Sequence, residues 1–499
     1  MISNITYWLD EAARKYPDKI AFADENKSIT YAQLSNQAKA IASSLIDRKV
    51  FKKPVAIYMN KNVDTIVAFF GIAYSGNFYS CLDVEMPAYR IKNILEILDP
   101  ELILTTKAVS CDDITFEYPK DVLFFEDEIC HEVNEKRVLD AGKKIINTDL
   151  LYIVFTSGST GVSKGVAVTH RSVINLIDWF DETFQMNDAD VMGNQTPFNF
   201  ALVVFDIYGT VSKGMTCHII PKPLFLQPVL LLEYLKENRI NSLVWIPSAL
   251  TTVSRINAFE KVDLNNILKR VIFCGEVMPN KELNVWRKYL PGVRYAQMYG
   301  SSEANICLYY IVDRDFSDEE ALPLGIPTMN IDVLVLNDND RPVKEGESGE
   351  LCVRGTMINA GYYNDLQKTN EVFVQNPLNT ALPELIYRTG DLVKYNSGEL
   401  FYTSRKDYQI KHMGYRIELG EIETAAASIP EVNSCCCLYD KEKRKIVLFI
   451  DANIDCTYIQ NQLSQKIPKY MIPGKIVILE TMPTNANGKI DRVKLKEML

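Results

Sequence analysis

The chain has 499 residues, of which 47% are hydrophobic and 24% are charged. This balance is typical of a folded globular protein with a large core, and it excludes a disordered chain or a fibrous repeat. Asp and Glu total 64 against 54 for Lys and Arg, and the net charge of −10 gives no reason to expect nucleic acid as a partner.

Eleven cysteines are too few and too irregularly spaced for a disulfide framework, and they form no C-x-x-C pair of the kind that binds zinc. The chain has no run of about 20 apolar residues and does not open on a basic segment followed by an apolar stretch. We therefore expect reduced thiols, a cytoplasmic protein and no membrane partner.

The first half of the chain alternates β-rich runs with segments of helical periodicity, which is typical of parallel βα units. The runs rich in Val, Ile and Phe predict strands at 55–59, 102–105, 122–125, 152–155, 242–246 and 270–273. The intervening periodic segments predict helices at 64–74 and 88–98.

The pattern changes in the second half. Residues 331–402 carry short strands separated by turn signals such as Asn396-Ser397-Gly398, which predicts antiparallel β-structure. After Arg405 a smaller α+β unit follows, with strands at 446–450 and 475–479 and a helix at 458–466. The expected fold class is α/β. A large N-terminal domain (1–403) of βα-layered subdomains and a β-rich subdomain precedes a small, mobile C-terminal domain (404–499).

The segment 152–165, YIVFTSGSTGVSKG, predicts a loop that holds anionic oxygens. Its glycines let the backbone approach a ligand, and its N–H groups and hydroxyls can converge on phosphate. The P-loop spacing G-x-x-x-x-G-K-[ST] fails, because a first glycine at 158 would require another at 163, which is Ser163. Taken alone, the segment could instead be a Ser/Gly-rich surface turn.

With seven further motifs in order, this loop resembles the adenylate-forming superfamily of acyl-CoA synthetases, luciferases and nonribosomal-peptide adenylation domains. The motifs are Ile29–Leu34, Tyr299–Glu303, Gly349–Leu351, Tyr387–Leu392, Arg405–Gln409, Arg416–Glu423 and Asn487–Arg492. The segment Phe273–Pro279 and the stand-alone length are similar to D-alanine:carrier-protein ligases.

The resemblance implies attack of a carboxylate on the α-phosphorus of ATP, followed by transfer of the acyl group to a thiol. ATP and Mg²⁺ are the implied cofactors, and a carrier protein with a phosphopantetheine arm is the implied partner. Because both reactants are anions, positioning and charge neutralisation must supply most of the catalysis.

The resemblance also assigns roles to individual residues. The nucleotide is expected to contact Thr156, Ser157, Gly158, Ser159, Thr160, Gly161, Lys164, Gly275, Glu276, Tyr299, Gly300, Ser301, Ser302, Asp391 and Arg405. Lys489, Thr160 and Glu303 are expected to be catalytic, and Glu303 to ligate Mg²⁺. Asp407 is the implied hinge between the domains, while Gly414 and Tyr415 would line the thiol tunnel. Taken singly, such residues are commonly solvated or cap turns.

The implied acyl pocket is apolar or weakly polar. Its residues are Phe200, Ala201, Leu202, Phe205, Val244, Ile272, Cys274, Met298, Ile306 and Cys307. Ala201 stands where α-amino-acid enzymes usually carry an Asp, and a buried ammonium without that carboxylate is strongly disfavoured. Asp206 is a poor replacement, since five residues at 100° place it about 140° away around a helix.

We therefore expect a small or medium hydrophobic carboxylic acid without a conventionally bound α-amine. The alternatives are a hydrophobic α-amino acid whose amine is held by backbone carbonyls, an acyl-CoA ligase that uses CoA as acceptor, and a binding module without enzymatic activity.

Overall fold

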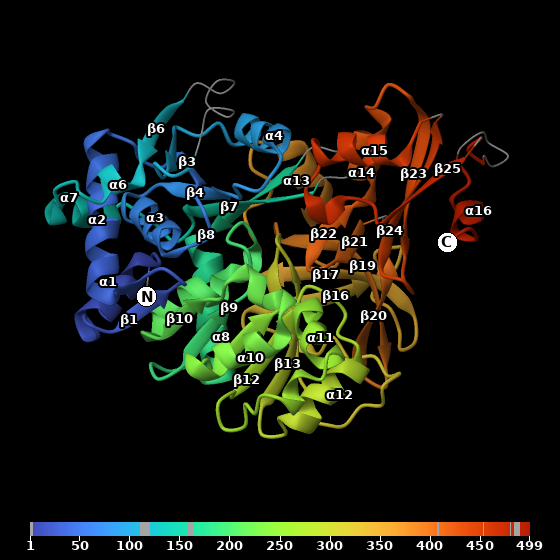
Figure 1. The fold of residues 1–499 in the computed structure, drawn as a ribbon, viewed down its shortest axis with the longest axis horizontal. Coiled ribbons are helices and arrows are strands. Elements are labelled where there is room, and N and C mark those ends of the chain that lie inside the picture. Colours follow the sequence, from blue (N-terminus) through green and yellow to red (C-terminus); the bar gives the residue numbers. More distant parts are fainter. Residues whose placement is uncertain are drawn as a thin grey trace.

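The computed structural model describes residues 3–109, 120–157, 163–406, 409–452, 454–479, 481–483 and 490–499. A large α/β N-terminal part carries a small α+β C-terminal part at one side (Figure 1, upper right). This arrangement confirms the predicted fold class. Among the described residues, no helix is long and apolar enough to cross a membrane.

A six-stranded sheet has the order β6-β5-β3-β4-β7-β8, parallel except for the antiparallel pair β7–β8. Its strands are β3 (Pro54–Tyr58), β4 (Phe78–Leu82), β5 (Leu102–Thr105), β6 (Asp121–Phe124), β7 (Leu150–Thr156) and β8 (Lys164–Thr169). The predicted strands are present, although Phe125 begins a short helix instead of ending β6.

A nine-stranded sheet has the order β15-β14-β13-β12-β11-β9-β10-β1-β2. Its strands are β1 (Ile20–Ala23), β2 (Ser28–Thr30), β9 (Val191–Asn194), β10 (Thr216–Ile219), β11 (Ser242–Trp245), β12 (Arg270–Cys274), β13 (Arg294–Ser301), β14 (Asn305–Ile311) and β15 (Ile326–Pro327). The strands from β1 to β13 in this order run parallel, and β14 and β2 pair antiparallel at either side.

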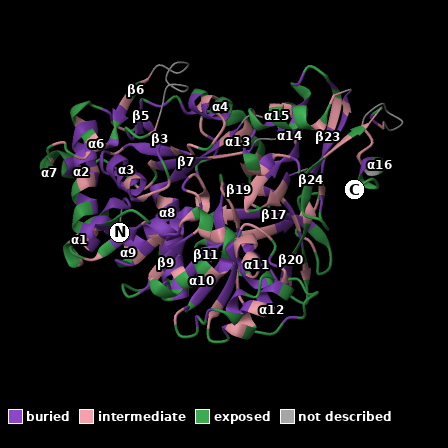
Figure 2. Ribbon diagram, in the orientation of Figure 1, coloured by how far each residue is buried: buried purple, intermediate pink, exposed green. Residues whose placement is uncertain are grey.

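Helices cover and join these two sheets. They are α1 (Thr6–Lys15), α2 (Tyr31–Asp47), α3 (Val63–Tyr74), α4 (Ala88–Leu98), α6 (Phe125–Glu128), α7 (Glu135–Gly142), α8 (His170–Phe184), α9 (Thr210–Lys213), α10 (Pro228–Glu237), α11 (Pro247–Arg255) and α12 (Asn280–Tyr289). Helix α2 begins with a capping box between Thr30 and Gln33, which satisfies two otherwise unpaired backbone N–H groups. Every residue of α3 except Asp64 is buried, so this helix lies in the core (Figure 2).

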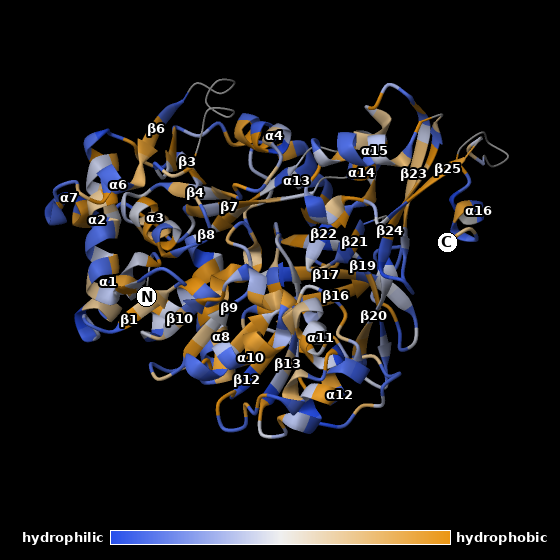
Figure 3. Ribbon diagram, viewed as in Figure 1, coloured by the Kyte–Doolittle hydropathy of each residue, from blue (hydrophilic) through white to orange (hydrophobic). Residues whose placement is uncertain are grey.

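A third, antiparallel sheet is formed by β16 (Ile331–Leu336), β17 (Ser348–Gly355), β18 (Phe373–Gln375), β19 (Leu385–Asn396) and β20 (Glu399–Arg405). Helix α13 (Leu366–Val372) precedes β18. The antiparallel structure predicted for 331–402 is therefore confirmed. Hydrophobic and hydrophilic stretches are mixed along this sheet, as the orange and blue colours in Figure 3 show.

Within the described residues, the C-terminal part contains a hairpin, a three-stranded sheet, three α-helices and a 3-10 turn at Lys469–Met471. Its elements are β21 (Gln409–His412), β22 (Tyr415–Glu418), α14 (Leu419–Ala427), β23 (Val432–Asp440), β24 (Lys445–Ala452), α15 (Cys456–Ser464), β25 (Lys475–Leu479) and α16 (Arg492–Lys496). It has its own apolar core, in which Ile422, Leu448 and Leu463 are fully buried. The ten cysteines in the described part of the chain are free thiols.

Candidate functional site

The predicted phosphate loop lies between β7 and β8, which pair up to Thr156 and Lys164. Gly158, Ser159, Thr160 and Gly161 lie outside the described residues. The Thr156 hydroxyl is buried and has no hydrogen-bond partner among the described residues. A buried hydroxyl without a partner at the mouth of this loop suits an anionic oxygen, because burying an unsatisfied polar group is costly.

Glu303 lies in the turn between β13 and β14 and is fully buried. Tyr362 donates to its Oε1 at 2.7 Å, and Arg416 donates to its Oε2 at 2.5 Å. Burial by itself would raise the pKa of this carboxyl group, but the Arg416 cation and the hydrogen bonds lower it to about 2. Glu303 is therefore ionised, and its charged oxygens are chemically suited to a hard divalent cation.

Three residues expected to contact the nucleotide, Tyr299, Asp391 and Arg405, come together from three strands. Tyr299 in β13 donates its hydroxyl to Asp391 in β19, and Arg405 in β20 donates to the other oxygen of Asp391 at 2.7 Å. Asp391 and Arg405 are direct cross-strand neighbours. Lys411 of β21 lies with its Nζ 5.0 Å from the centroid of the Tyr299 ring.

Gly300 keeps the strand before Glu303 in place. The register between β13 and β14 shifts at Tyr299 and Gly300, and a Cβ on Gly300 would lie 1.7 Å from the backbone oxygen of Asn305. No side chain can be accommodated at Gly300 without moving strands β13 and β14, which flank the turn that contains Glu303.

Replacing Gly300 by alanine is therefore expected to destabilise the fold by about 3 kcal/mol or more, because the added methyl group overlaps backbone atoms. Urea unfolding followed by far-ultraviolet circular dichroism measures this change. The matched control is Gly292→Ala, where a Cβ would meet nothing within 4 Å. Equal unfolding midpoints for the two variants would show that the Gly300 contact is not restrictive.

The hairpin β21–β22 of the C-terminal part is docked on this site. Its Gly414 N–H donates to Glu276 Oε1 at 2.8 Å, and Glu276 Oε2 accepts from the backbone of Ser248 at 2.9 Å. Gly414 has φ +78°, and a Cβ there would lie 2.7 Å from Ile246. The turn therefore needs glycine both for its backbone conformation and for its close approach to the core.

Strand β22 also contacts Ser157 and Lys164, which lie on either side of the predicted phosphate loop. Ser157 donates its hydroxyl to the Arg416 backbone oxygen at 2.6 Å and accepts from the Glu418 backbone N–H at 3.2 Å. Lys164 Nζ lies 3.4 Å from Glu418 Oε1. Burial lowers the pKa of Lys164, and the negative charge of Glu418 partly opposes this shift.

A buried ion pair between Arg90 of α4 and Glu421 of α14 also joins the two parts. Arg90 and Tyr362 lie in none of the motifs. Arg416 and Glu418 lie in the motif Arg416–Glu423, but no individual role was expected for them. These contacts join residues far apart in the sequence, and no local sequence signal pointed to them.

The residues predicted to form the acyl pocket come from neighbouring strands and one irregular helical segment. Val244, Ile272, Cys274 and Met298 lie on the adjacent strands β11, β12 and β13 and are at most 5% exposed. Phe205, Ile306 and Cys307 belong to the same apolar cluster, against which Ala201 and Leu202 pack. The half-buried Phe200 meets the Tyr415 ring edge-on, with centroids 4.8 Å apart.

Two family profiles match this chain. The profile of the family AMP-binding enzyme matches residues 9–363, and that of its C-terminal domain matches residues 421–489. The chain belongs to the AMP-binding enzyme family. It is therefore an ATP-dependent adenylating ligase, and the alternative of a non-enzymatic binding module is wrong.

This AMP-binding enzyme is similar along its whole length to curated proteins. It is 30% identical to D-alanine–D-alanyl carrier protein ligase of Bacillus licheniformis, over 98% of this chain and 99% of that protein. It is 28% identical to tyrocidine synthase 1 of Brevibacillus parabrevis, over 98% of this chain and 44% of that protein.

Solved structures share the fold of the enzyme. The crystal structure of IdnL1 has a TM-score of 0.82 at 22% identity and covers 97% of this chain and 99% of its own. Holo-PA1221, described as containing adenylation and PCP domains, has a TM-score of 0.84 at 21% identity. The match covers 100% of this chain and 84% of the PA1221 chain.

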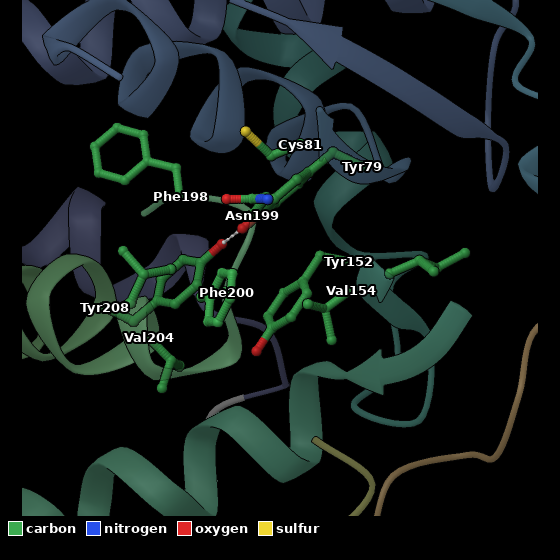
Figure 4. Close-up of a pocket in the computed structure, with 11 residues that line it drawn as sticks. Tyr79, Cys81, Tyr152, Val154, Phe198, Asn199, Phe200, Val204 and Tyr208 are labelled. Atoms are coloured by element: carbon green, nitrogen blue, oxygen red, sulfur yellow. Dashed lines mark hydrogen bonds between the residues drawn. The ribbon is translucent and has the colours of Figure 1, made fainter. Parts of the chain in front are cut away.

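A small cavity lies beside the predicted acyl pocket of the AMP-binding enzyme (Figure 4). Its lining residues are Tyr79, Cys81, Tyr152, Ile153, Val154, Phe198, Asn199, Phe200, Val203, Val204 and Tyr208. Of the predicted pocket residues, Phe200 alone lines this cavity. The hydroxyls of Tyr79 and Tyr208 are 2.5 Å apart, and the Tyr152 hydroxyl points away from them.

The segment after Phe200 is not the regular α-helix that the angular argument assumed. Ala201–Val203 forms a 3-10 turn and Phe205–Gly209 a single π-helical turn, so the value of about 140° does not apply. Asp206 is nevertheless engaged elsewhere, because its Oδ2 accepts from Asn194 Nδ2 at 2.7 Å. Burial raises the pKa of Asp206 to about 7, while Asn194 and Lys61 oppose the shift.

This raised pKa predicts a stability change with pH. The contribution of Asp206 is fully present below its unfolded pKa of 3.8 and is lost as the pH rises through about 7, which amounts to at most about 4 kcal/mol. Asp206→Asn is expected to flatten the decline in unfolding free energy over this range. Thermal or urea unfolding of both proteins across the range measures it, and parallel curves would contradict the raised pKa.

Proposed function

We propose that this enzyme, acting in the cytoplasm, uses ATP to convert a small or medium hydrophobic carboxylic acid into an acyl-adenylate. It then transfers the acyl group to the phosphopantetheine thiol of a carrier protein. The observation that carries this proposal is that strand β22 pairs with both the ionised Glu303 and Lys164, while Lys164 and the unpaired Thr156 hydroxyl flank the Ser/Gly-rich segment of the sequence.

The site residues suit ATP and Mg²⁺ on chemical grounds. Thr156, Ser157 and Lys164 would hold the phosphates, and Ser159 and Thr160 would join them. Asp391 and Arg405 would hold the ribose, with Tyr299 at the adenine. Glu303 would ligate Mg²⁺, which when bound neutralises phosphate charge and so supports displacement at the α-phosphorus.

Catalysis here depends on bringing two anions together. We assign Lys489, ten residues before the C-terminus, to neutralise the carboxylate and the α-phosphate oxygens. Lys489 and the proposed hinge Asp407 both lie outside the described residues. The domain boundary near residue 404 and a reorientation of the C-terminal domain between the two half-reactions belong to the same proposal.

The acid is proposed to lack a conventionally bound α-amine. In support, Ala201 replaces the usual Asp, the predicted lining is apolar, and the Asp206 carboxylate is engaged by Asn194. An unpaired buried ammonium would be strongly destabilising. The competing substrate is a hydrophobic α-amino acid whose amine is held by backbone carbonyls.

ATP–pyrophosphate exchange with a panel of hydrophobic acids, each tested with and without its α-amine, decides the substrate class. The expected result is exchange with the des-amino acids at rates no lower than with their amino counterparts. Robust exchange with an α-amino acid and none with its des-amino analogue would overturn the substrate proposal.

The acceptor is tested separately. Carrier loading is supported by the relatives of this enzyme, which include D-alanine–D-alanyl carrier protein ligases. We expect acylation of a phosphopantetheinylated carrier by the activated acid, measured by intact-protein mass spectrometry. Faster acylation of CoA than of any carrier would identify an acyl-CoA ligase instead.

A further inference from the structure

Three side chains of the proposed phosphate and metal site form ion pairs or hydrogen bonds with strand β22. Glu303 is paired with Arg416, Lys164 with Glu418, and the Ser157 hydroxyl bridges the backbone between them. Glu303 lies more than 130 residues from Ser157 and Lys164 in the sequence, yet a stretch of three residues in β22 contacts all of them.

The charges in these contacts match those of the proposed ligands. The Arg416 cation pairs with Glu303, the carboxylate that would hold Mg²⁺. The Glu418 anion pairs with Lys164, the lysine that would hold phosphate. The pairs are shielded from water: the Glu303 side chain is 0% exposed, Lys164 11% and Glu418 5%. Surface ion pairs of chance geometry do not combine such burial with such complementarity.

We propose that Arg416 and Glu418 stand in for Mg²⁺ and pyrophosphate, respectively, when the hairpin docks after pyrophosphate has left. The docked pair excludes pyrophosphate while the thioester forms, and so prevents the acyl-adenylate from being converted back to ATP. This inference rests on the proposed function, and it makes Arg416 and Glu418 positioning residues that do not themselves touch the reacting atoms.

The energetic reason lies in what pyrophosphate release leaves behind. Glu303 would remain buried beside Tyr362 without a cation, and Lys164 without an anion. An unpaired buried charge costs several kcal/mol, so replacement partners stabilise the emptied site. Since Arg416 and Mg²⁺ cannot occupy the same side of Glu303 together, each must weaken the binding of the other by the same factor.

Equilibrium binding of Mg²⁺·pyrophosphate to the full chain, measured by isothermal titration calorimetry, tests this competition without any acid substrate. A docked population of about 90% lowers the apparent affinity about tenfold. Arg416→Gln and Glu418→Gln, which each remove one stand-in charge, are therefore expected to bind Mg²⁺·pyrophosphate about tenfold more tightly than the wild type. Arg416→Lys keeps the positive charge and is expected to stay within about threefold of the wild type.

The matched control is Arg255→Gln, which breaks an ion pair with Glu282 inside the N-terminal part and does not touch the C-terminal part. Its affinity is expected to stay within about threefold of the wild type. Hydrogen exchange of residues 409–418 gives a second readout, and added Mg²⁺·pyrophosphate should increase exchange there in the wild type. Circular dichroism confirms that each variant is folded.

Three outcomes overturn the inference: unchanged affinity in both Arg416→Gln and Glu418→Gln, an equal gain in the control Arg255→Gln, or no change in hydrogen exchange. The inference is also overturned if neither the wild type nor any variant binds Mg²⁺·pyrophosphate, because Arg416 and Glu418 would then have no ligand to replace. The exchange assay of the proposed function is independent of these titrations, so adenylation can stand while this inference fails.

Discussion

Replacing Glu303 by glutamine is expected to lower the rate of ATP–pyrophosphate exchange by about a thousandfold. The substitution keeps the size of the side chain and an oxygen that can accept from Tyr362, but it removes the negative charge proposed to hold Mg²⁺. A neutral amide oxygen is a much weaker ligand for a small divalent cation. Exchange should be measured over a series of Mg²⁺ concentrations, with the best acid from the panel.

The control for this variant is Glu282→Gln. Glu282 is another buried carboxylate, held by Ser254 and Arg255, and it is not part of the proposed site. It is expected to keep the wild-type rate within about twofold, because a lost ion pair at a partly exposed arginine costs little. If Glu303→Gln kept most of its activity at saturating Mg²⁺, the metal assignment would be wrong.

Lys489→Ala is expected to reduce adenylate formation by about a thousandfold and to leave transfer from a supplied acyl-adenylate within about threefold of the wild type. The ammonium neutralises two anions only while they react with one another. In the transfer step the attacking group is a thiol, and the docked hairpin instead faces the site. Single-turnover assays of the two half-reactions measure the difference.

Lys494→Ala is the matched control, because Lys494 is an exposed lysine in the adjacent helix α16. Both half-reactions should proceed at the wild-type rate in this variant. Equal losses in the two half-reactions of Lys489→Ala would contradict a role confined to adenylation.

The fold could be predicted largely from local pattern. Strands β5, β7 and β12 are short β-rich runs, and parallel strands buried on both faces must read as such runs. The turn signals in 331–402 likewise correspond to an antiparallel sheet. The 3-10 and π-helical turns of 201–209 could not be predicted, because their sequence is as apolar as a regular core helix.

The candidate site could be predicted only in part. The positions of Tyr299 and Asp391 follow from motif resemblance, but their mutual hydrogen bond joins residues 92 apart in sequence. The pairing of Arg416 with Glu303 spans 113 residues and depends on how the C-terminal part docks. Such contacts are set by tertiary packing, and no local pattern of charge or periodicity encodes them.

The Arg90–Glu421 ion pair has a thermal consequence. Both side chains are nearly fully buried, at 5% and 6% exposure, so in the proposed reorientation of the C-terminal part they would lose their hydration each time the two parts close. That loss becomes less costly on warming, because the hydration of charged groups carries a strongly negative entropy. We therefore expect warming, short of unfolding, to favour the closed arrangement of the two parts. Opening of the two parts would then become slow relative to the chemical steps. The rate of the catalytic cycle is expected to rise less on warming than the rates of its chemical steps.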